Sequence, residues 1–218
     1  MMAVLLTVTL GQKKDTLGPT LMRGWGRLML AIMGVRLELD PEAEAELASR
    51  RARVLTFNHT STLDMMVGAA ISPEGTIIIV KREMLYIPFI GQCMLLLDIV
   101  LINRRDRQSA TSKLRAVGER IRKGRHAVMI APEGTRSADG RLQKFKMGAF
   151  HLAIETQVPI VPLVWHQCAT LCPRGAWYSK PGVIRVQKLP DIPTEGLTSD
   201  DLRSLADRLH AAYAANVP

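Results

Sequence analysis

The sequence predicts an α/β domain with a largely parallel central sheet flanked by helices. Short apolar runs rich in β-branched residues alternate with segments of helical periodicity between residues 54 and 164. The strand-like runs are apolar throughout, as expected of parallel strands that helices cover on both faces. A chain of 218 residues suffices for one such domain with short appendages. At this length, folding buries roughly 70% of the unfolded surface, so neither a disulfide nor a metal is needed for stability.

Seven strands are expected, at residues 35–39, 54–57, 76–80, 99–102, 127–130, 160–164 and 183–187. Helices are expected at residues 63–71, 109–123, 148–156 and 198–215, and residues 40–53 are expected to form a connection or a short helix. In the last helix Thr198 or Ser199 can cap the N-terminus, and Leu202, Leu205 and Leu209 recur at helical spacing.

The first 34 residues differ from the remainder and divide the chain into residues 1–34 and residues 35–218. No positive charge precedes the first apolar run, so a cleaved signal peptide is not expected. Residues 21–34 combine Arg23, Trp25 and Arg27 with aliphatic side chains, which is typical of an amphipathic helix at a membrane interface. The same pattern fits a basic-edged helix packed on its own domain, and the sequence leaves both interpretations open.

The charge balance favours anionic partners. The chain has 29 Lys and Arg against 20 Asp and Glu, a net charge of +9. Such a charge suits nucleic acid, an acidic carrier protein, a phosphate-bearing substrate or an anionic bilayer. Nucleic acid is not expected, because aromatic residues make up only 5% of the chain and no helix-turn-helix, zinc or RNA-binding signature is present.

The cysteines indicate a reducing compartment and no metal site. Three cysteines, Cys93, Cys168 and Cys172, are too few for a disulfide framework. His166 with Cys168 and Cys172 supplies at most three soft ligands and lacks a second Cys-x-x-Cys arm, so structural zinc is not expected.

A candidate acid–base pair follows the strand at 54–57. His59 and Asp64 are five residues apart, which on one continuous helix would place them on different faces. They can meet only if His59 precedes the helix and the chain turns at residues 60–62. A carboxylate so placed would fix the imidazole as a general base. The alternative is a capping box from Ser61 to Asp64, in which the carboxylate only caps the helix.

A second candidate site follows the strand at 127–130. Gly134 allows the backbone to approach a ligand closely, and the planar fork of Arg136 suits phosphate oxygens. Thr135 adds a donor, and Lys146 extends the basic surface. Glu133 could bond a substrate hydroxyl or hold Arg136. The alternative is an ordinary solvated turn.

A third polar group, at Arg104, ends the strand at 99–102. Because the carboxyl ends of parallel strands share one edge of a sheet, three polar motifs at such ends are expected to form one site.

These motifs occur in the order NHTSTLD (58–64), INR (102–104), PEGTRS (132–137) and VPIVP (158–162). In this order they resemble the four blocks of the glycerolipid acyltransferase family, most closely the 1-acyl-sn-glycerol-3-phosphate acyltransferases. VKREM with IPFIG (80–84, 87–91) and FKMG (145–148) resemble the stretches between and after the blocks. The resemblance covers roughly residues 34–164, and four ordered blocks are far more specific than H-x-x-x-x-D alone.

The resemblance implies a membrane-associated enzyme that moves a fatty acyl group from acyl-CoA or acyl-carrier protein to a lysophospholipid hydroxyl. With lysophosphatidic acid as acceptor, the product is phosphatidic acid. His59 would be the general base, Asp64 would orient it, and the hydroxyl would attack the thioester directly, without an acyl-enzyme. Arg104, Glu133, Gly134 and Arg136 would bind the glycerol-phosphate end.

The same resemblance implies residues 35–218 as the acyltransferase domain, no cofactor beyond the acyl donor, and a peripheral (monotopic) position on the cytoplasmic face of a membrane.

Ala131, Asn103 and Thr62 depart from the usual residues of the blocks and leave the acyl-chain or acceptor preference open. The acceptor could therefore be another lysophospholipid, a lyso-ornithine lipid or glycerol 3-phosphate. A non-catalytic basic membrane-binding protein is the alternative of another class. A serine hydrolase is not expected, because the chain contains no G-x-S-x-G elbow.

Overall fold

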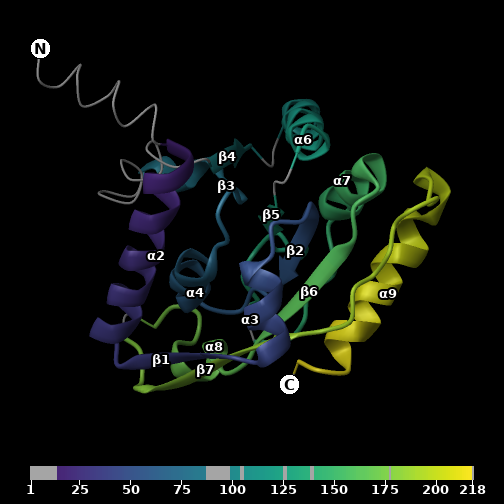
Figure 1. The fold of residues 1–218 in the computed structure, drawn as a ribbon. Helices are drawn as coiled ribbons and strands as arrows, with labels where there is room; N and C mark the ends of the chain where they lie inside the picture. Colours follow the sequence, from purple (N-terminus) through teal and green to yellow (C-terminus); the bar gives the residue numbers. More distant parts are fainter. Residues whose placement is uncertain are drawn as a thin grey trace, which may run out of the picture.

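The computed structural model describes residues 14–86, 99–103, 106–124, 127–137, 140–176 and 178–217. Within these residues it shows a mixed α/β fold around a seven-stranded sheet (Figure 1). The strands are β1 (Val35–Leu39), β2 (Arg53–Phe57), β3 (Ile77–Lys81), β4 (Ile99–Ile102), β5 (Ala127–Ile130), β6 (Ile160–Trp165) and β7 (Gly182–Lys188). Their order in the sheet is β1-β7-β6-β2-β5-β3-β4.

The described helices lie on both faces of this sheet (Figure 1). They are α2 (Lys14–Ile32), α3 (Pro41–Ala48), α4 (Leu63–Ile71), α6 (Arg107–Arg122), α7 (Gly148–Thr156), α8 (Cys168–Leu171) and α9 (Leu202–Ala214), with 3-10 turns η1 (Arg82–Tyr86) and η2 (Ser199–Asp201). The strands predicted from sequence are confirmed to within one residue at each end. The short α8 and η1 are not predicted, because four or five residues show no helical period.

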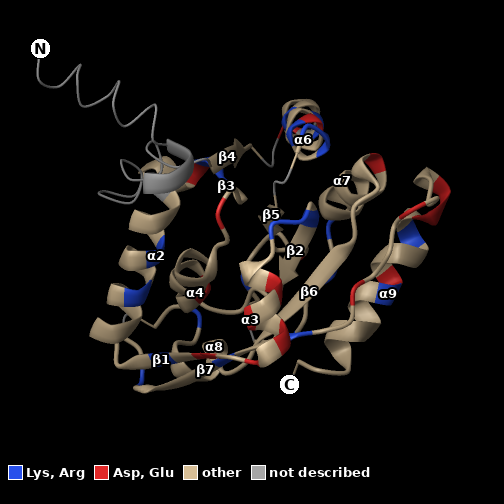
Figure 2. Cartoon of the chain, viewed as in Figure 1, with Lys and Arg blue, Asp and Glu red and all other residues tan. Residues whose placement is uncertain are grey.

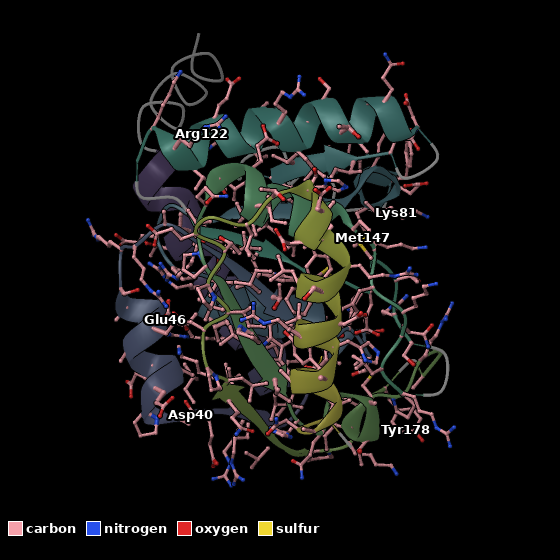
Figure 3. The ribbon with its side chains drawn as sticks, turned by 90° about the vertical axis from the view of Figure 1, so that its right-hand side faces the viewer. Asp40, Glu46, Lys81, Arg122, Met147 and Tyr178 are labelled. Atoms are coloured by element: carbon pink, nitrogen blue, oxygen red, sulfur yellow. The ribbon has the colours of Figure 1, made fainter. Side chains whose placement is uncertain are left out.

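The sheet is mostly parallel, as predicted. Strands β6, β2, β5, β3 and β4 run in one direction. β7 is antiparallel to β6, and β1 pairs with β7 in parallel, so these two strands run the other way. Because β2 and β5 are parallel neighbours, the polar residues that follow them meet at one edge of the sheet. Figure 3 shows Lys81, at the end of β3, on the same side of the molecule as Met147 and Tyr178.

Side chains of the central strands pack on both faces of the sheet. Val54 and Leu55 are adjacent in β2, both are fully buried, and they belong to two different hydrophobic clusters. One cluster includes residues of α2, α4 and α8, and the other includes residues of α6, α7 and α9. This double coverage explains why the sequences of the central strands are mostly apolar.

Helix α2 packs closely against α4. Gly26 faces α4 so tightly that a Cβ there would lie 2.5 Å from Ala70 N and 2.7 Å from Met66 O. Leu30 of the same helix is buried in the core. The interpretation of residues 21–34 as a helix packed on its own domain is therefore confirmed for one side of α2.

Another side of α2 is open. Leu21, Leu28 and Ile32 are 57%, 56% and 69% exposed. They are spaced by seven and four residues, which places them on one stripe of the helix. In the part of the chain that the structure describes, no helix is long and apolar enough to cross a membrane.

Candidate active site

The chain leaves β2 at a fixed point. The side chain of Asn58 accepts a hydrogen bond from Trp165 N at 2.7 Å and donates one to Trp165 O at 3.1 Å. It thus continues the pairing of β2 with β6 beyond the last strand residue. Phe57 stacks on the Trp165 ring at 4.1 Å and meets the His59 ring edge-on at 5.9 Å. These contacts of Phe57 and Asn58 fix the position of the backbone that leads into His59.

His59 and Asp64 are in contact, as their spacing and the intervening turn predict. His59 Nδ1 lies 2.8 Å from Asp64 Oδ2. The Asp64 side chain is fully buried, whereas the His59 side chain is 26% exposed. Since a carboxylate accepts at Nδ1, this nitrogen carries the proton and Nε2 is left to accept one from a substrate.

The same carboxylate oxygen also accepts the backbone amides of Thr60, at 2.7 Å, and Ser61, at 2.8 Å. Asp64 therefore closes the turn before α4 as well as holding the imidazole. A reciprocal capping box does not form, because the Ser61 hydroxyl accepts from Leu63 N and donates to Cys172 O. Both interpretations of Asp64 thus describe part of one arrangement.

Two buried cysteines lie behind this turn. Cys168 and Cys172 are free thiols in and directly after α8. Burial, and then the charge of Asp64 and a hydrogen bond with it, raise the pKa of the Cys168 thiol well above its usual range. Among the described residues, no group of three or more His, Cys, Asp or Glu side chains could hold a metal ion.

The loop after β5 forms hydrogen bonds with the backbone of His59. Glu133 is only 1% exposed. Its Oε1 accepts the amide of His59 at 2.6 Å, and its Oε2 accepts the amide of Gln143 at 2.9 Å. The amide of Ser137 donates to His59 O at 2.9 Å. Burial raises the pKa of the Glu133 carboxyl, and the two amide hydrogen bonds oppose that increase.

Gly134 adopts a left-handed conformation, with φ of +71°, in this loop. A Cβ at Gly134 would lie 3.2 Å from Lys146 Cγ. The amide of Lys146 donates to Pro132 O at 2.7 Å, which draws the two segments together. Lys146 and Thr135 are both exposed. A glycine is needed here for its conformation and for the close approach of Lys146.

Arg136 reaches from this loop to the turn after β2. Its Nη1 donates to Thr62 Oγ1 at 2.6 Å, and Thr62 lies between His59 and Asp64 in the sequence. Arg174, from the segment after α8, donates to Arg136 O at 3.2 Å. The described ion pairs give neither guanidinium a carboxylate partner.

The predicted site residues are brought together in large part. His59, Asp64, Glu133, Gly134 and Arg136 lie at one edge of the sheet, in two loops joined by hydrogen bonds. Arg104 lies outside the described residues. The arrangement combines a buried carboxylate, a partly exposed imidazole and a nearby guanidinium, which can remove a proton from a substrate and bind an anionic group.

Asn58 and Arg174 are contacts that sequence reasoning did not identify. Asn58 bonds to a residue 107 positions away, and Arg174 to one 38 positions away. A polar residue directly after a buried strand is the only local signal for Asn58, and no local signal marks Arg174.

Comparisons with known proteins match the chain to one family. A family model described as Acyltransferase matches residues 41–166. The human protein named 1-acyl-sn-glycerol-3-phosphate acyltransferase beta is 39% identical over 180 residues, which cover 82% of this chain and 64% of that protein. The human alpha protein of the same name is 35% identical, covering 84% of this chain and 65% of its own length. The chain thus spans slightly less than two thirds of these relatives.

A solved structure has the same fold. The crystal structure of the 1-acyl-sn-glycerophosphate (LPA) acyltransferase PlsC from Thermotoga maritima aligns with a TM-score of 0.71. The two sequences are 20% identical, and the alignment covers 92% of this chain and 81% of that one. The likeness supports the α/β architecture.

Proposed function

We propose, since the chain belongs to the acyltransferase family, that it transfers a fatty acyl group from a thioester to the free hydroxyl of 1-acyl-sn-glycerol 3-phosphate. The product would be phosphatidic acid. Several relatives are named for this acceptor. The single observation that carries the proposal is the contact between His59 and Asp64, with the guanidinium of Arg136 bonded to the turn that joins them.

The chemistry follows from the free nitrogen of His59. Nε2 accepts the proton of the acceptor hydroxyl while the oxygen attacks the thioester carbonyl carbon. The tetrahedral adduct collapses, the C–S bond breaks, and the thiolate takes up the proton from the imidazolium. Asp64 holds the ring in the productive tautomer and stabilises its positive charge during the transfer. No acyl-enzyme is required.

The glycerol-phosphate end of the acceptor would lie at the loop after β5. Arg136 offers a planar fork to phosphate oxygens, and Lys146 and the Thr135 hydroxyl lie in or beside the same loop. Arg174 contributes a second guanidinium close to Arg136. A binding role for Arg104 stays a prediction. The proposed reaction needs no metal or cofactor besides the acyl donor, which is acyl-CoA or acyl-carrier protein.

A lipid acceptor would require the enzyme to reach a membrane. The exposed apolar stripe of α2, beside the exposed cation Arg27, fits a helix that rests in a bilayer interface. We propose that residues 1–34 provide this contact, that residues 35–218 form the acyltransferase domain, and that the protein is peripheral on the cytoplasmic face.

A panel assay tests the proposed reaction. The full chain is offered lysophosphatidic acid, a lysophosphatidylcholine, a lyso-ornithine lipid and glycerol 3-phosphate, each with acyl-CoA and with acyl-carrier protein. Products are identified by mass spectrometry. We expect phosphatidic acid from lysophosphatidic acid, and we expect the His59→Ala variant to lose about 10²–10⁴-fold in rate, the range for loss of a general base.

The His59→Ala variant should retain the wild-type circular dichroism spectrum, because the ring is partly exposed and its removal leaves the core intact. Transfer at the wild-type rate by this variant would remove His59 from the reaction. Acylation of a different acceptor only, still dependent on His59, would keep the chemistry and change the substrate.

A further inference from the structure

We infer that Glu133 is a positioning residue for the general base and does not bind the substrate. Its carboxylate and the amide of Ser137 hold the backbone of His59 from both sides. This inference rests on the proposed function, since it assigns Glu133 a part in the same reaction. It replaces the expectation that Glu133 contacts the glycerol-phosphate end.

The two hydrogen bonds at His59 run in opposite directions. The His59 amide donates to Glu133 Oε1 at 2.6 Å, and the His59 carbonyl accepts from Ser137 N at 2.9 Å. A donor and an acceptor of one residue are therefore both held by the loop that follows β5. Asp64 holds the ring through Nδ1. Together these contacts restrain the position of the base as well as its orientation.

The second oxygen of Glu133 fixes the carboxylate itself. Oε2 accepts the amide of Gln143, at 2.9 Å, from the segment that returns toward α7. That segment is also joined to the loop by the hydrogen bond from Lys146 N to Pro132 O. Glu133 thus bridges two backbone segments. A carboxylate suits this task because both of its oxygens are acceptors and neither is a donor.

Burial separates Glu133 from the residues that could meet a phosphate. Glu133 is 1% exposed, whereas Thr135 is exposed and Arg136 partly exposed in the same loop. An anionic substrate would also be repelled by an ionised carboxylate. Arg136 points to Thr62, so the guanidinium does not rest on Glu133 either. Within this loop the buried Glu133 holds the base, and the partly exposed Arg136 is available to bind the substrate.

Three variants test this role against substrate binding. Glu133→Gln keeps the shape but places an amide donor against one of the two backbone N–H groups. Glu133→Asp keeps both acceptors on a shorter side chain, and Glu133→Ala removes both. Glu195→Gln is the matched control, because Glu195 is exposed and lies in the turn before η2.

We expect Glu133→Ala to lower kcat by about 10²-fold, the loss that a displacement of about 1 Å in a reacting group can cause. The KM values for both substrates should stay within about twofold, since no ground-state contact is lost. Glu133→Gln should lie between Glu133→Ala and wild type, and Glu195→Gln should match wild type. A rise in the acceptor KM with little change in kcat would overturn the inference and make Glu133 a substrate ligand.

Hydrogen exchange provides a readout that does not need activity. In the wild type, the peptide that contains the His59 amide should exchange slowly, because this amide is bonded to a buried carboxylate. Glu133→Ala should speed exchange at this peptide while the peptides of α9 and β7 keep wild-type rates. Unchanged protection at His59 would contradict the inference. If the wild type acylates nothing in the panel, the proposed function fails, and this exchange result still decides whether Glu133 holds His59.

Discussion

The side chain of Arg136 links the loop after β5 to the turn after β2. It starts in the loop after β5 and ends on the hydroxyl of Thr62, in the turn that carries His59 and Asp64. A neutral hydroxyl is a weak partner for a guanidinium, so a phosphate could displace or share this contact. This hydrogen bond joins the loop that carries Arg136, the proposed anion-binding group, to the turn that carries His59, the proposed proton acceptor.

Replacing Arg136 by alanine should therefore weaken acceptor binding in particular. A charge-assisted hydrogen bond contributes about 1.5–3 kcal/mol, so the acceptor KM of Arg136→Ala should rise by roughly 10- to 150-fold. The donor KM should change by less than about twofold, because the proposal gives Arg136 a contact with the acceptor phosphate and none with the acyl donor. Steady-state kinetics with each substrate varied in turn measure both constants.

Arg208→Ala is the control for this prediction. Arg208 is exposed on α9, and the change removes the same charge and leaves both KM values near wild type. Equal rises in the donor and acceptor KM for Arg136→Ala would contradict a specific phosphate role. Arg136→Lys should restore only part of the affinity, since an ammonium cannot bind two oxygens in one plane.

Sequence reasoning reached His59 and Asp64 because a five-residue spacing demands a turn, and the turn residues are local. It could not reach the role of Glu133, since the partners of its carboxylate are amides of His59 and Gln143. Any backbone carries such amides, so the residue types hold no signal. Only the adjacency of β2 and β5 in the folded sheet brings these groups together.

Among the elements, the central strands were predictable because both of their faces are buried. The direction of β1 and β7 was not, since a strand has the same composition whichever way it runs. That α2 packs against α4 in particular could not be predicted either. It depends on Gly26, and the sequence gives no reason to distinguish this glycine from Gly24, two residues earlier.

These two glycines make a matched pair in one helix. A Cβ at Gly24 meets nothing within 4 Å, whereas a Cβ at Gly26 would meet the backbone of Ala70 and Met66 at less than 3 Å. Gly24→Ala should stabilise the protein by up to about 1 kcal/mol through helix propensity. Gly26→Ala gains the same propensity but must separate α2 from α4, and overpacking of this kind costs about 1–3 kcal/mol.

Thermal unfolding followed by circular dichroism measures the difference. For a domain of this size, 1 kcal/mol corresponds to about 2–4 °C in Tm, so Gly24→Ala should raise Tm and Gly26→Ala should lower it by a similar or larger amount. If both variants shift Tm in the same direction, the close packing of α2 on α4 is not what determines stability at this contact.

On the scale of the whole molecule, the sheet separates two helical layers, and α2 forms the outer edge of one of them (Figure 1). In Figure 2 the ribbon of α2 carries Lys and Arg positions (blue), and the ribbon of α3 carries Asp and Glu positions (red). One side of α2 packs against α4, while the stripe of Leu21, Leu28 and Ile32 is exposed. An open apolar stripe beside basic residues is the pattern of a helix that lies on an anionic bilayer.

This stripe can be tested without removing the helix, whose loss would uncover α4. We expect the triple variant Leu21→Ser, Leu28→Ser, Ile32→Ser to bind vesicles of phosphatidylcholine with phosphatidylglycerol more weakly than the wild type, by about tenfold or more in sedimentation assays. Loss of roughly half the burial of three large aliphatic side chains corresponds to a few kcal/mol, which allows such an effect. Its Tm should fall little, because these side chains are mostly exposed.

The pair Arg203→Ser and Asp207→Ser on the exposed face of α9 keeps the net charge and should leave vesicle binding unchanged. Equal partitioning of the triple variant and the wild type would show that the stripe on α2 is not the surface through which this protein reaches the proposed lipid acceptor.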